Sequence, residues 1–280
     1  MARPVANPIG AMSRLAKAGD LPALKLYANL YDLMRCLVVL LFVFAFYCHA
    51  EDRLSPSVKQ LLVAIAPDWN SMDGKLQRLE KTESGWRAVG PPIPVLFGKS
   101  GLAWGRGLLV GQGGGPIKVE RDHRAPAGVF RIGIIYTYDN SLPPGADYPF
   151  HTVSAGDAWV DDIHSVHYNQ HVTVDPANPP PWFEKQKMRQ GDFAYRWLVE
   201  IRHNTDPAVP GFGSAIFFHI RRGSERPSAG CTTMAEQNLV EIIRWLRSAA
   251  NPEYVCLPKA EYLARVQAWG LPDPAVAQLF

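Results

Sequence analysis

From about residue 57 onward, glycine, proline and serine divide the chain into short apolar runs, and this pattern restricts the folds that it can adopt. The sequence contains 24 prolines and 23 glycines, residues that end regular elements and favour turns. Runs of strand length occur at 61–66, 129–137, 195–201 and 215–220. Many short strands joined by turns favour a β-sandwich or a β-barrel. We therefore expect a mainly β domain of the α+β class.

Two helices are expected near the C-terminus. The first carries apolar residues at helical spacing, which would face the core: Leu239, Ile242, Ile243 and Leu246. Thr233, followed three residues later by Glu236, predicts a capping box at the start of this helix. The second helix is expected from about 258 to 269, with Gly270 ending it.

The N-terminal part has the features of a leader. An apolar run at 36–48 follows Arg35, and it is shorter than the about 20 residues that a membrane span needs. Its length suits the core of a signal peptide, and Ala50 lies where a signal peptidase would cleave. We therefore expect a leader over 1–50, with a signal-peptide-like segment at 34–50.

This leader predicts the compartment. Cleavage near Ala50, or retention of the leader as an inner-membrane anchor, places the rest of the chain in the periplasm or cell envelope. Translation from Met34 rather than Met1 would remove an unusually long lead-in. Membrane association is expected only through this segment. The net charge of +3 is spread along the chain, so nucleic acid is not an expected partner.

The cysteines divide between the leader and the remaining chain. Cys36 and Cys48 belong to the leader, whereas Cys231 and Cys256 lie beyond it. An exported protein with two cysteines can pair them. Cys256, however, lies in an apolar run typical of a buried strand, so we expect a free Cys231.

Cys231 and a nearby histidine have the surroundings that a thiol nucleophile needs. Segment 216–223 reads IFFHIRRG and segment 228–234 reads SAGCTTM, so a strand delivers His219 shortly before Cys231. The predicted capping box places a helix N-terminus just after Cys231, which would lower the thiol pKa from about 8.5 toward neutrality. His219 would act as general base and then as general acid.

Neighbouring residues would supply the rest of the site. Backbone amides of Ser228, Gly230 and Thr232 are candidates for an oxyanion hole. Arg222 is a candidate for binding an anionic substrate group. The alternative is a buried structural thiol beside a strand histidine that hydrogen-bonds a backbone carbonyl, and spacing alone does not separate the two.

The segment around Cys231 resembles the nucleophile motif of the L,D-transpeptidases, the YkuD-type domain of peptidoglycan enzymes. Other segments resemble family landmarks: 118–132 (KVERDHRAPAGVFRI), 159–162 (WVDD), 168–169 (YN) and 213–219 (GSAIFFH). The similarity covers about 57–257, which leaves 258–280 as a C-terminal helix and tail. The implied fold is a β-sandwich of mixed sheets, with one helix after the cysteine and another at the C-terminus.

The resemblance also implies a reaction on peptidoglycan stem peptides. The thiolate of Cys231 would attack the carbonyl that links the third residue of a tetrapeptide stem to its terminal D-alanine, and His219 would protonate the leaving amine. An amine acceptor then gives a cross-link, whereas water gives L,D-carboxypeptidase action; an amidase on the same site is a further alternative. No metal or organic cofactor is implied. Tyr168, Asn169 and Trp182 are expected at the substrate cleft.

Two departures from the common family motif leave the donor and acceptor open. That motif reads Ser/Thr-His-Gly-Cys and continues two residues later with Arg or a similar polar residue. Here Ala229 replaces the histidine and Thr233 replaces the arginine. The sequence is most similar to a variant subgroup that reads Ala-Gly-Cys.

Two other classes of protein compete with this interpretation. A zinc peptidase would draw its ligands from the histidines, although no His-Glu-x-x-His pattern is present. A wall-binding module would use the proline-rich segment 177–183 as a groove, but it would have no use for a reactive thiol. The histidines available to a zinc site are His151, His164, His167, His171 and His203.

Overall fold

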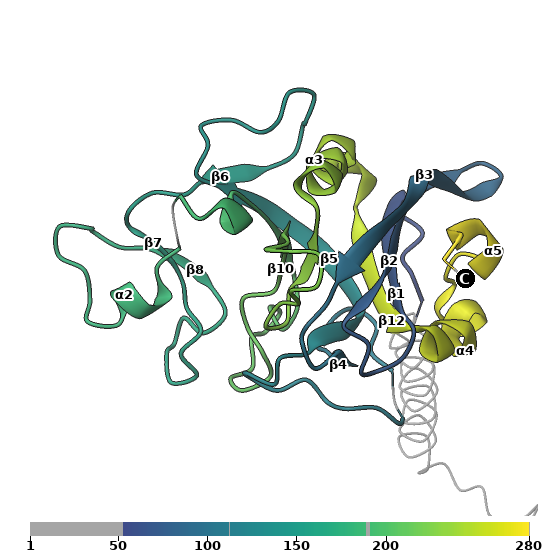
Figure 1. The fold of residues 1–280 in the computed structure, drawn as a ribbon, viewed down its shortest axis with the longest axis horizontal. Helices are drawn as coiled ribbons and strands as arrows, with labels where there is room; N and C mark the ends of the chain where they lie inside the picture. The colour runs from purple at the N-terminus through teal and green to yellow at the C-terminus, as the bar shows by residue number, and fades with distance from the viewer. Residues whose placement is uncertain (1–52, 112, 189–190, 280) are drawn as a thin grey trace, which may run out of the picture. The chain divides into compact units, whose positions relative to one another are not determined.

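The computed structural model describes residues 53–111, 113–188 and 191–279 (Figure 1). These residues form a mainly β fold in which one large sheet has the strand order β12-β1-β2-β3-β11-β10-β9-β5-β4. The sheet curves round on itself, because β12 also pairs with β5, and β6 adds to β5. A separate small sheet consists of β7 and β8. The mainly β class with mixed sheets is therefore confirmed.

The strands of the large sheet pair in both directions. The pairs β1–β12, β10–β11, β4–β5 and β5–β6 are parallel, and the remaining pairs are antiparallel. The strands are β1 (Gln60–Ala66), β2 (Asp73–Thr82), β3 (Gly85–Leu96), β4 (Leu102–Trp104), β5 (Ala125–Thr137), β6 (Phe150–Thr152), β7 (Asp157–Trp159), β8 (His171–Thr173), β9 (Trp197–Ile201), β10 (Phe217–Ile220), β11 (Thr232–Met234) and β12 (Glu253–Pro258).

The core lies around β1 and β12, whose residues are all buried. A strand covered on both faces requires an uninterrupted apolar run, which is what β1 provides with the sequence QLLVAIA. Helix α4 (Lys259–Trp269) packs against β1 and β12. Gly270 ends α4 in the left-handed conformation, at φ +62°, as expected for a helix C-cap.

Helix α3 (Glu236–Trp245) contacts β10 and therefore supports the strand that carries His219. Its predicted apolar stripe is confirmed, since Leu239, Ile242 and Ile243 are fully buried. The predicted capping box is wrong. Thr233 belongs to β11, and the N-cap is Ala235, which has no side-chain cap.

The reason is a strand pairing that the local sequence does not show. Thr233 pairs with Leu96 of β3, and its hydroxyl donates to the Leu96 carbonyl at 3.4 Å. Its side chain is buried in this pairing and is not available to cap a helix.

The remaining helical segments are short. They are α2 (Phe183–Gln186), α5 (Pro274–Ala277) and two 3₁₀ turns, Phe193–Tyr195 and Ser248–Ala250. The predicted strand at 195–201 starts later than expected, because the Asp192 side chain accepts from the Ala194 amide and caps the first 3₁₀ turn.

Cys231 and Cys256 are both free, as expected. The predicted leader lies outside the described residues. Among the residues that the structure describes, no helix is long and apolar enough to cross a membrane.

Packing of α3 against the sheet should dominate the stability of the site region. Because Ile242 is fully buried, Ile242→Ala should lower the free energy of unfolding by about 2–5 kcal/mol. Chemical denaturation measures this change. Gln237→Ala, at an exposed position of the same helix, is the matched control and should have little effect. Equal losses in the two variants would contradict this packing.

Candidate active site

Cys231 and His219 are brought together by the parallel pairing of β10 and β11. His219 lies opposite Thr233 in the register. Side chains alternate along a strand, so Cys231, two residues before Thr233, faces the same side as His219. Both residues line a cavity of about 440 Å³, and Thr233 lines it too. A second cavity of about 220 Å³ adjoins the same two residues from the side of Trp159 and Phe217.

Ser228 fixes the turn that leads into Cys231. Its hydroxyl donates to the Cys231 carbonyl at 2.5 Å and accepts from the Gly230 amide at 2.9 Å, while its own amide donates to the Phe97 carbonyl at 2.9 Å. Gly230 has φ +153°, and a Cβ there would lie 3.0 Å from the Arg124 carbonyl oxygen, so glycine is required.

The hydrogen bonds of this turn involve two of the three amides that are predicted to form an oxyanion hole. Both the Ser228 amide and the Gly230 amide already have partners: the first donates to the Phe97 carbonyl and the second to the Ser228 hydroxyl. Thr232 is buried, its hydroxyl is 2.9 Å from the Tyr254 hydroxyl, and it is not part of the cavity lining. Ser228 and Gly230 therefore act on the site by positioning Cys231 in this structure.

The Cys231 thiol is protonated at neutral pH. Burial raises its pKa to about 11, although the Phe217 amide and the charge of Lys118 oppose the rise. The Sγ atom donates to the Ala215 carbonyl at 3.5 Å. The predicted lowering of this pKa is wrong, because β11 separates Cys231 from the start of α3.

His219 is a neutral imidazole in the same environment. Burial lowers its pKa to about 4. Its Nδ1 lies 2.9 Å from the Ile220 carbonyl oxygen, which can only accept, so Nδ1 carries the proton. The Nε2 atom is then free of a proton and can act as a base. The resting pair is thus a thiol and a neutral histidine.

Basic side chains outnumber acidic ones in the lining of the cavity. Arg222 is held by Asp192, with 2.6 Å between Nη2 and Oδ2, and its guanidinium lies 5.1 Å from the centre of the Tyr195 ring. Two acidic residues, Glu120 and Asp161, also line the cavity. The basic residues in the lining are Lys118, Arg121, Arg222 and Arg226.

A family model, described as the L,D-transpeptidase catalytic domain (YkuD), matches residues 93–255, which include this site. The chain belongs to this family. No curated protein sequence matches the chain significantly. A solved structure, "Structure of Bdellovibrio bacteriovorus Bd1075", is similar with a TM-score of 0.35 and 12% identity; the match covers 75% of this chain and 54% of that one.

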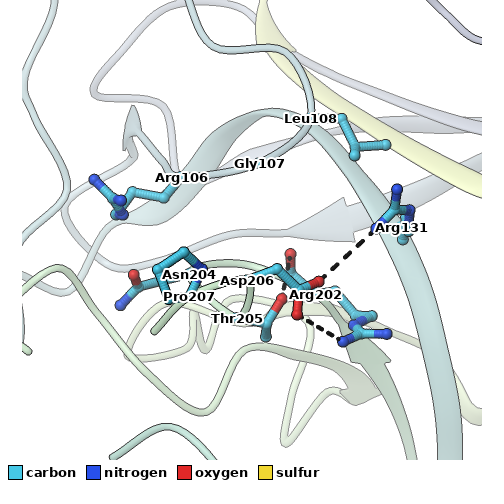
Figure 2. Close-up of a pocket in the computed structure, with 9 residues that line it drawn as sticks. All are labelled: Arg106, Gly107, Leu108, Arg131, Arg202, Asn204, Thr205, Asp206 and Pro207. Atoms are coloured by element: carbon cyan, nitrogen blue, oxygen red, sulfur yellow. Dashed lines mark hydrogen bonds and ion pairs between the residues drawn. The ribbon is translucent and has the colours of Figure 1, made fainter. Parts of the chain in front are cut away.

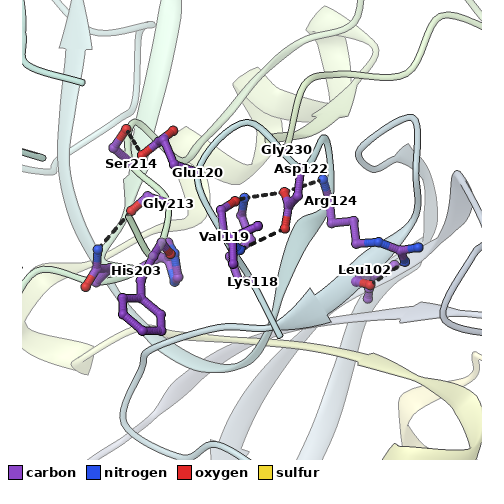
Figure 3. Close-up of polar contacts among 12 residues, drawn as sticks. Leu102, Lys118, Val119, Glu120, Asp122, Arg124, His203, Gly213, Ser214 and Gly230 are labelled. Carbon is purple, nitrogen blue, oxygen red and sulfur yellow. Dashed lines mark hydrogen bonds and ion pairs between the residues drawn. The ribbon is translucent and has the colours of Figure 1, made fainter. Parts of the chain in front are cut away.

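One wall of the YkuD cavity is the loop 118–124 (Figure 3). Asp122 organises it: the carboxylate pairs with Lys118 at 2.6 Å and accepts from the Val119 and Arg124 amides. Glu120 accepts from the hydroxyls of Tyr168 and Ser214. The motif at 118–132 resembles a family landmark, but it does not by itself predict these roles for Lys118, Glu120 and Asp122.

Asn169 and Tyr168 support the site from behind the cavity. The Asn169 Oδ1 accepts from the Ala215 amide at 2.9 Å, and its Nδ2 donates to the carbonyls of His203 and Asn204. Ala215 has a left-handed backbone, at φ +55°, and its carbonyl accepts from the Cys231 thiol. Asn169 thus positions the carbonyl that contacts the nucleophile. Neither Asn169 nor Tyr168 lines either cavity.

Trp182 is half-buried beside Phe183 and is also not part of the lining of these two cavities. The structure thus brings Arg222 to Cys231 and His219, whereas the three other predicted substrate contacts lie behind the cavity or away from it.

Of the five histidines considered for a zinc peptidase, His151 and His171 lie together, outside the linings of the two cavities at Cys231, whereas the other three lie apart from them. His203 is buried, with Nδ1 accepting from the Arg106 amide and Nε2 donating to the Phe212 carbonyl. His164 and His167 are exposed.

A further cavity of about 300 Å³ lies apart from the nucleophile (Figure 2). Its charges are largely paired, since Asp206 bridges Arg202 at 3.2 Å and Arg131 at 3.8 Å. Its lining includes neither cysteine nor histidine, so it lacks the chemistry of the YkuD site.

The raised thiol pKa predicts the pH dependence of alkylation. Iodoacetamide reacts with thiolate, so its rate at Cys231 should rise about tenfold per pH unit between about pH 7 and 10, the range below the raised pKa. Peptide mass spectrometry measures this rate and separates Cys231 from the fully buried Cys256. A plateau reached near neutral pH would show a resting thiolate–imidazolium pair instead.

Proposed function

We propose that this protein is a peptidoglycan L,D-transpeptidase with Cys231 as nucleophile and His219 as general base and acid. The observation that carries the proposal is the shared face of these two residues in one cavity of a YkuD domain. A structural thiol would not require a neutral histidine with a free Nε2 beside it.

The protonation states suggest how the first step proceeds. Because the resting pair is neutral, the thiol proton moves to Nε2 of His219 as Sγ attacks the substrate carbonyl. The new S–C bond forms, and the tetrahedral intermediate collapses with loss of the C–N bond to D-alanine. The imidazolium gives its proton to the leaving amine. A thioester on Cys231 remains.

An amine or water then resolves this thioester. His219, again neutral, accepts a proton from the incoming nucleophile, and Sγ leaves and recovers a proton. An amine acceptor gives the cross-link of a transpeptidase. Water gives an L,D-carboxypeptidase, and an amidase would use the same pair on a different linkage.

Arg222 in the cavity lining supports an anionic stem peptide as substrate. Arg222 is already oriented by Asp192 and Tyr195, so little side-chain entropy is lost when it binds a carboxylate. The small Ala229 in the cavity lining leaves space where the common motif has a histidine.

We also propose that the enzyme is exported to the periplasm or cell envelope, because its proposed substrate class lies there and because the sequence predicts a leader over 1–50. In this proposal translation starts at Met34. A C-terminally tagged Met34→Ala gene should then yield no product, and unchanged export would refute that start.

Acylation of Cys231 tests the nucleophile. A carbapenem should add its mass to the purified wild-type protein and to Cys256→Ala, but not to Cys231→Ala. His219→Ala should slow acylation about 10²- to 10⁴-fold. Intact mass spectrometry measures the adduct. A folded wild-type protein without an adduct would move the assignment to an amidase or a binding module.

Arg222 tests how the substrate is bound. Arg222→Ala should raise KM for a tetrapeptide stem about 10- to 100-fold and leave kcat nearly unchanged, because a charged hydrogen bond is lost in both ground and transition states. Arg87→Ala, an exposed position on β3 outside the cavity, should change neither constant. A fall in kcat alone would assign Arg222 to the chemical step.

A further inference from the structure

We propose that His151, Asp157 and His171 form a binding site for a divalent transition metal ion, preferably zinc, that fastens the small sheet to the large one. The three residues come from β6, β7 and β8. Each offers one ligand atom, and these atoms lie within 4.8 Å of one another. The inference is independent of the proposed function.

The donor atoms are arranged around one point. The Nε2 atoms of His151 and His171 lie 3.1 Å and 2.7 Å from the same carboxylate oxygen, Oδ1 of Asp157. Tetrahedral zinc holds nitrogen and oxygen donors at about 2.0–2.2 Å, which separates neighbouring donors by about 3.4 Å. Small side-chain rotations would therefore admit the ion.

The proposed ligand atom of His151 has no well-aligned hydrogen-bond partner. The Nε2 atom of His151 is buried, and its closest polar neighbour is the Asp157 Oδ1 atom at 3.1 Å, with which it forms an ion pair but no well-aligned hydrogen bond. Buried polar atoms are nearly always satisfied, so this nitrogen needs a partner. A metal ion in front of it supplies one, and two histidines with one carboxylate are a donor set that zinc accepts.

The surrounding contacts orient the ligands, as in metal sites with an ordered outer shell. The other carboxylate oxygen of Asp157 accepts from the amide and hydroxyl of Ser154 at 2.6 Å and 2.7 Å. Thr173 donates to Oδ1 at 2.7 Å. The Tyr136 ring packs 5.0 Å from the His171 ring and 5.8 Å from the His151 ring.

The position of the site indicates a structural role. None of the three residues lines the two cavities at Cys231. Tyr136 contacts Trp159 and Phe217 edge to face, and Cys231 packs against the same apolar cluster. Trp159, at the end of β7, also lines the smaller cavity. An ion at this point would hold β7, which carries the cavity-lining Trp159, against the large sheet.

Zinc binding by the whole protein tests the site. The Cys231→Ala variant, which lacks the accessible thiol, is freed of metal with a chelator and titrated with Zn²⁺ by calorimetry. We expect one ion per chain and a higher Tm on addition of zinc. His151→Ala and Asp157→Asn in the same background should lose both effects, whereas the exposed double variant His164→Ala/His167→Ala should keep them.

His151→Ala is the decisive variant, because the His151 side chain is the most exposed of the three and its removal should disturb the packing least. Circular dichroism confirms that the variant is folded. Zinc binding that His151→Ala leaves unchanged, or a folded parent protein that neither binds Zn²⁺ nor gains Tm, would overturn the proposal. The cluster would then be a histidine–aspartate hydrogen-bond network.

Discussion

The parallel pairing of β10 with β11 is the constraint on which the catalytic geometry depends. It sets His219 opposite Thr233 and thereby brings Cys231 to the same face of the sheet. A parallel pair cannot be closed by a tight turn, so a connection must cross between the strands. In this protein that connection ends in the Ser228 turn, whose hydrogen bonds fix the backbone of Cys231. Strand pairing and this turn thus position Cys231, whereas the local sequence predicts a helix N-terminus at this place.

Burial rather than a helix dipole controls the electrostatics of the pair. A helix N-terminus is worth about 0.3–1 kcal/mol to an adjacent anion, less than one pKa unit at about 1.36 kcal/mol each. Burial raises the pKa of Cys231 to about 11 and lowers that of His219 to about 4, so both groups are shifted toward their neutral forms. The nucleophile is therefore formed during attack, and the free enzyme is protected from unselective reaction.

The sequence alone identifies the features that are local. The stripe on α3, the apolar run of β1 and the free Cys231 all follow from neighbouring residues, and Cys231 and His219 lie close enough in the chain to be considered together. The local sequence predicts a cap at Thr233, whereas its strand partner, Leu96, lies far away in the sequence. The sequence predicts that Asn169 binds substrate, and the structure shows that Asn169 also supports Ala215 through a long-range contact. Sequence motifs thus identify residues of the site region, whereas long-range contacts such as strand pairing determine the structural role of each residue.

The cleft needs two rigid walls, and they are stabilised in different ways. On one side, the buried Lys118–Asp122 pair holds the 118–124 loop, and because Lys118 is almost fully buried its charge also opposes the rise in the Cys231 pKa. On the other side, β7 and β8 form a two-stranded sheet, to which only a single bridge between Ala158 and Lys187 is added. Two three-residue strands bury too little apolar surface to hold a fixed position unaided. The contacts of Asp157 and its two histidines join this sheet to β6, so the geometry of the cleft depends on that cluster as well as on the nucleophile's own strands.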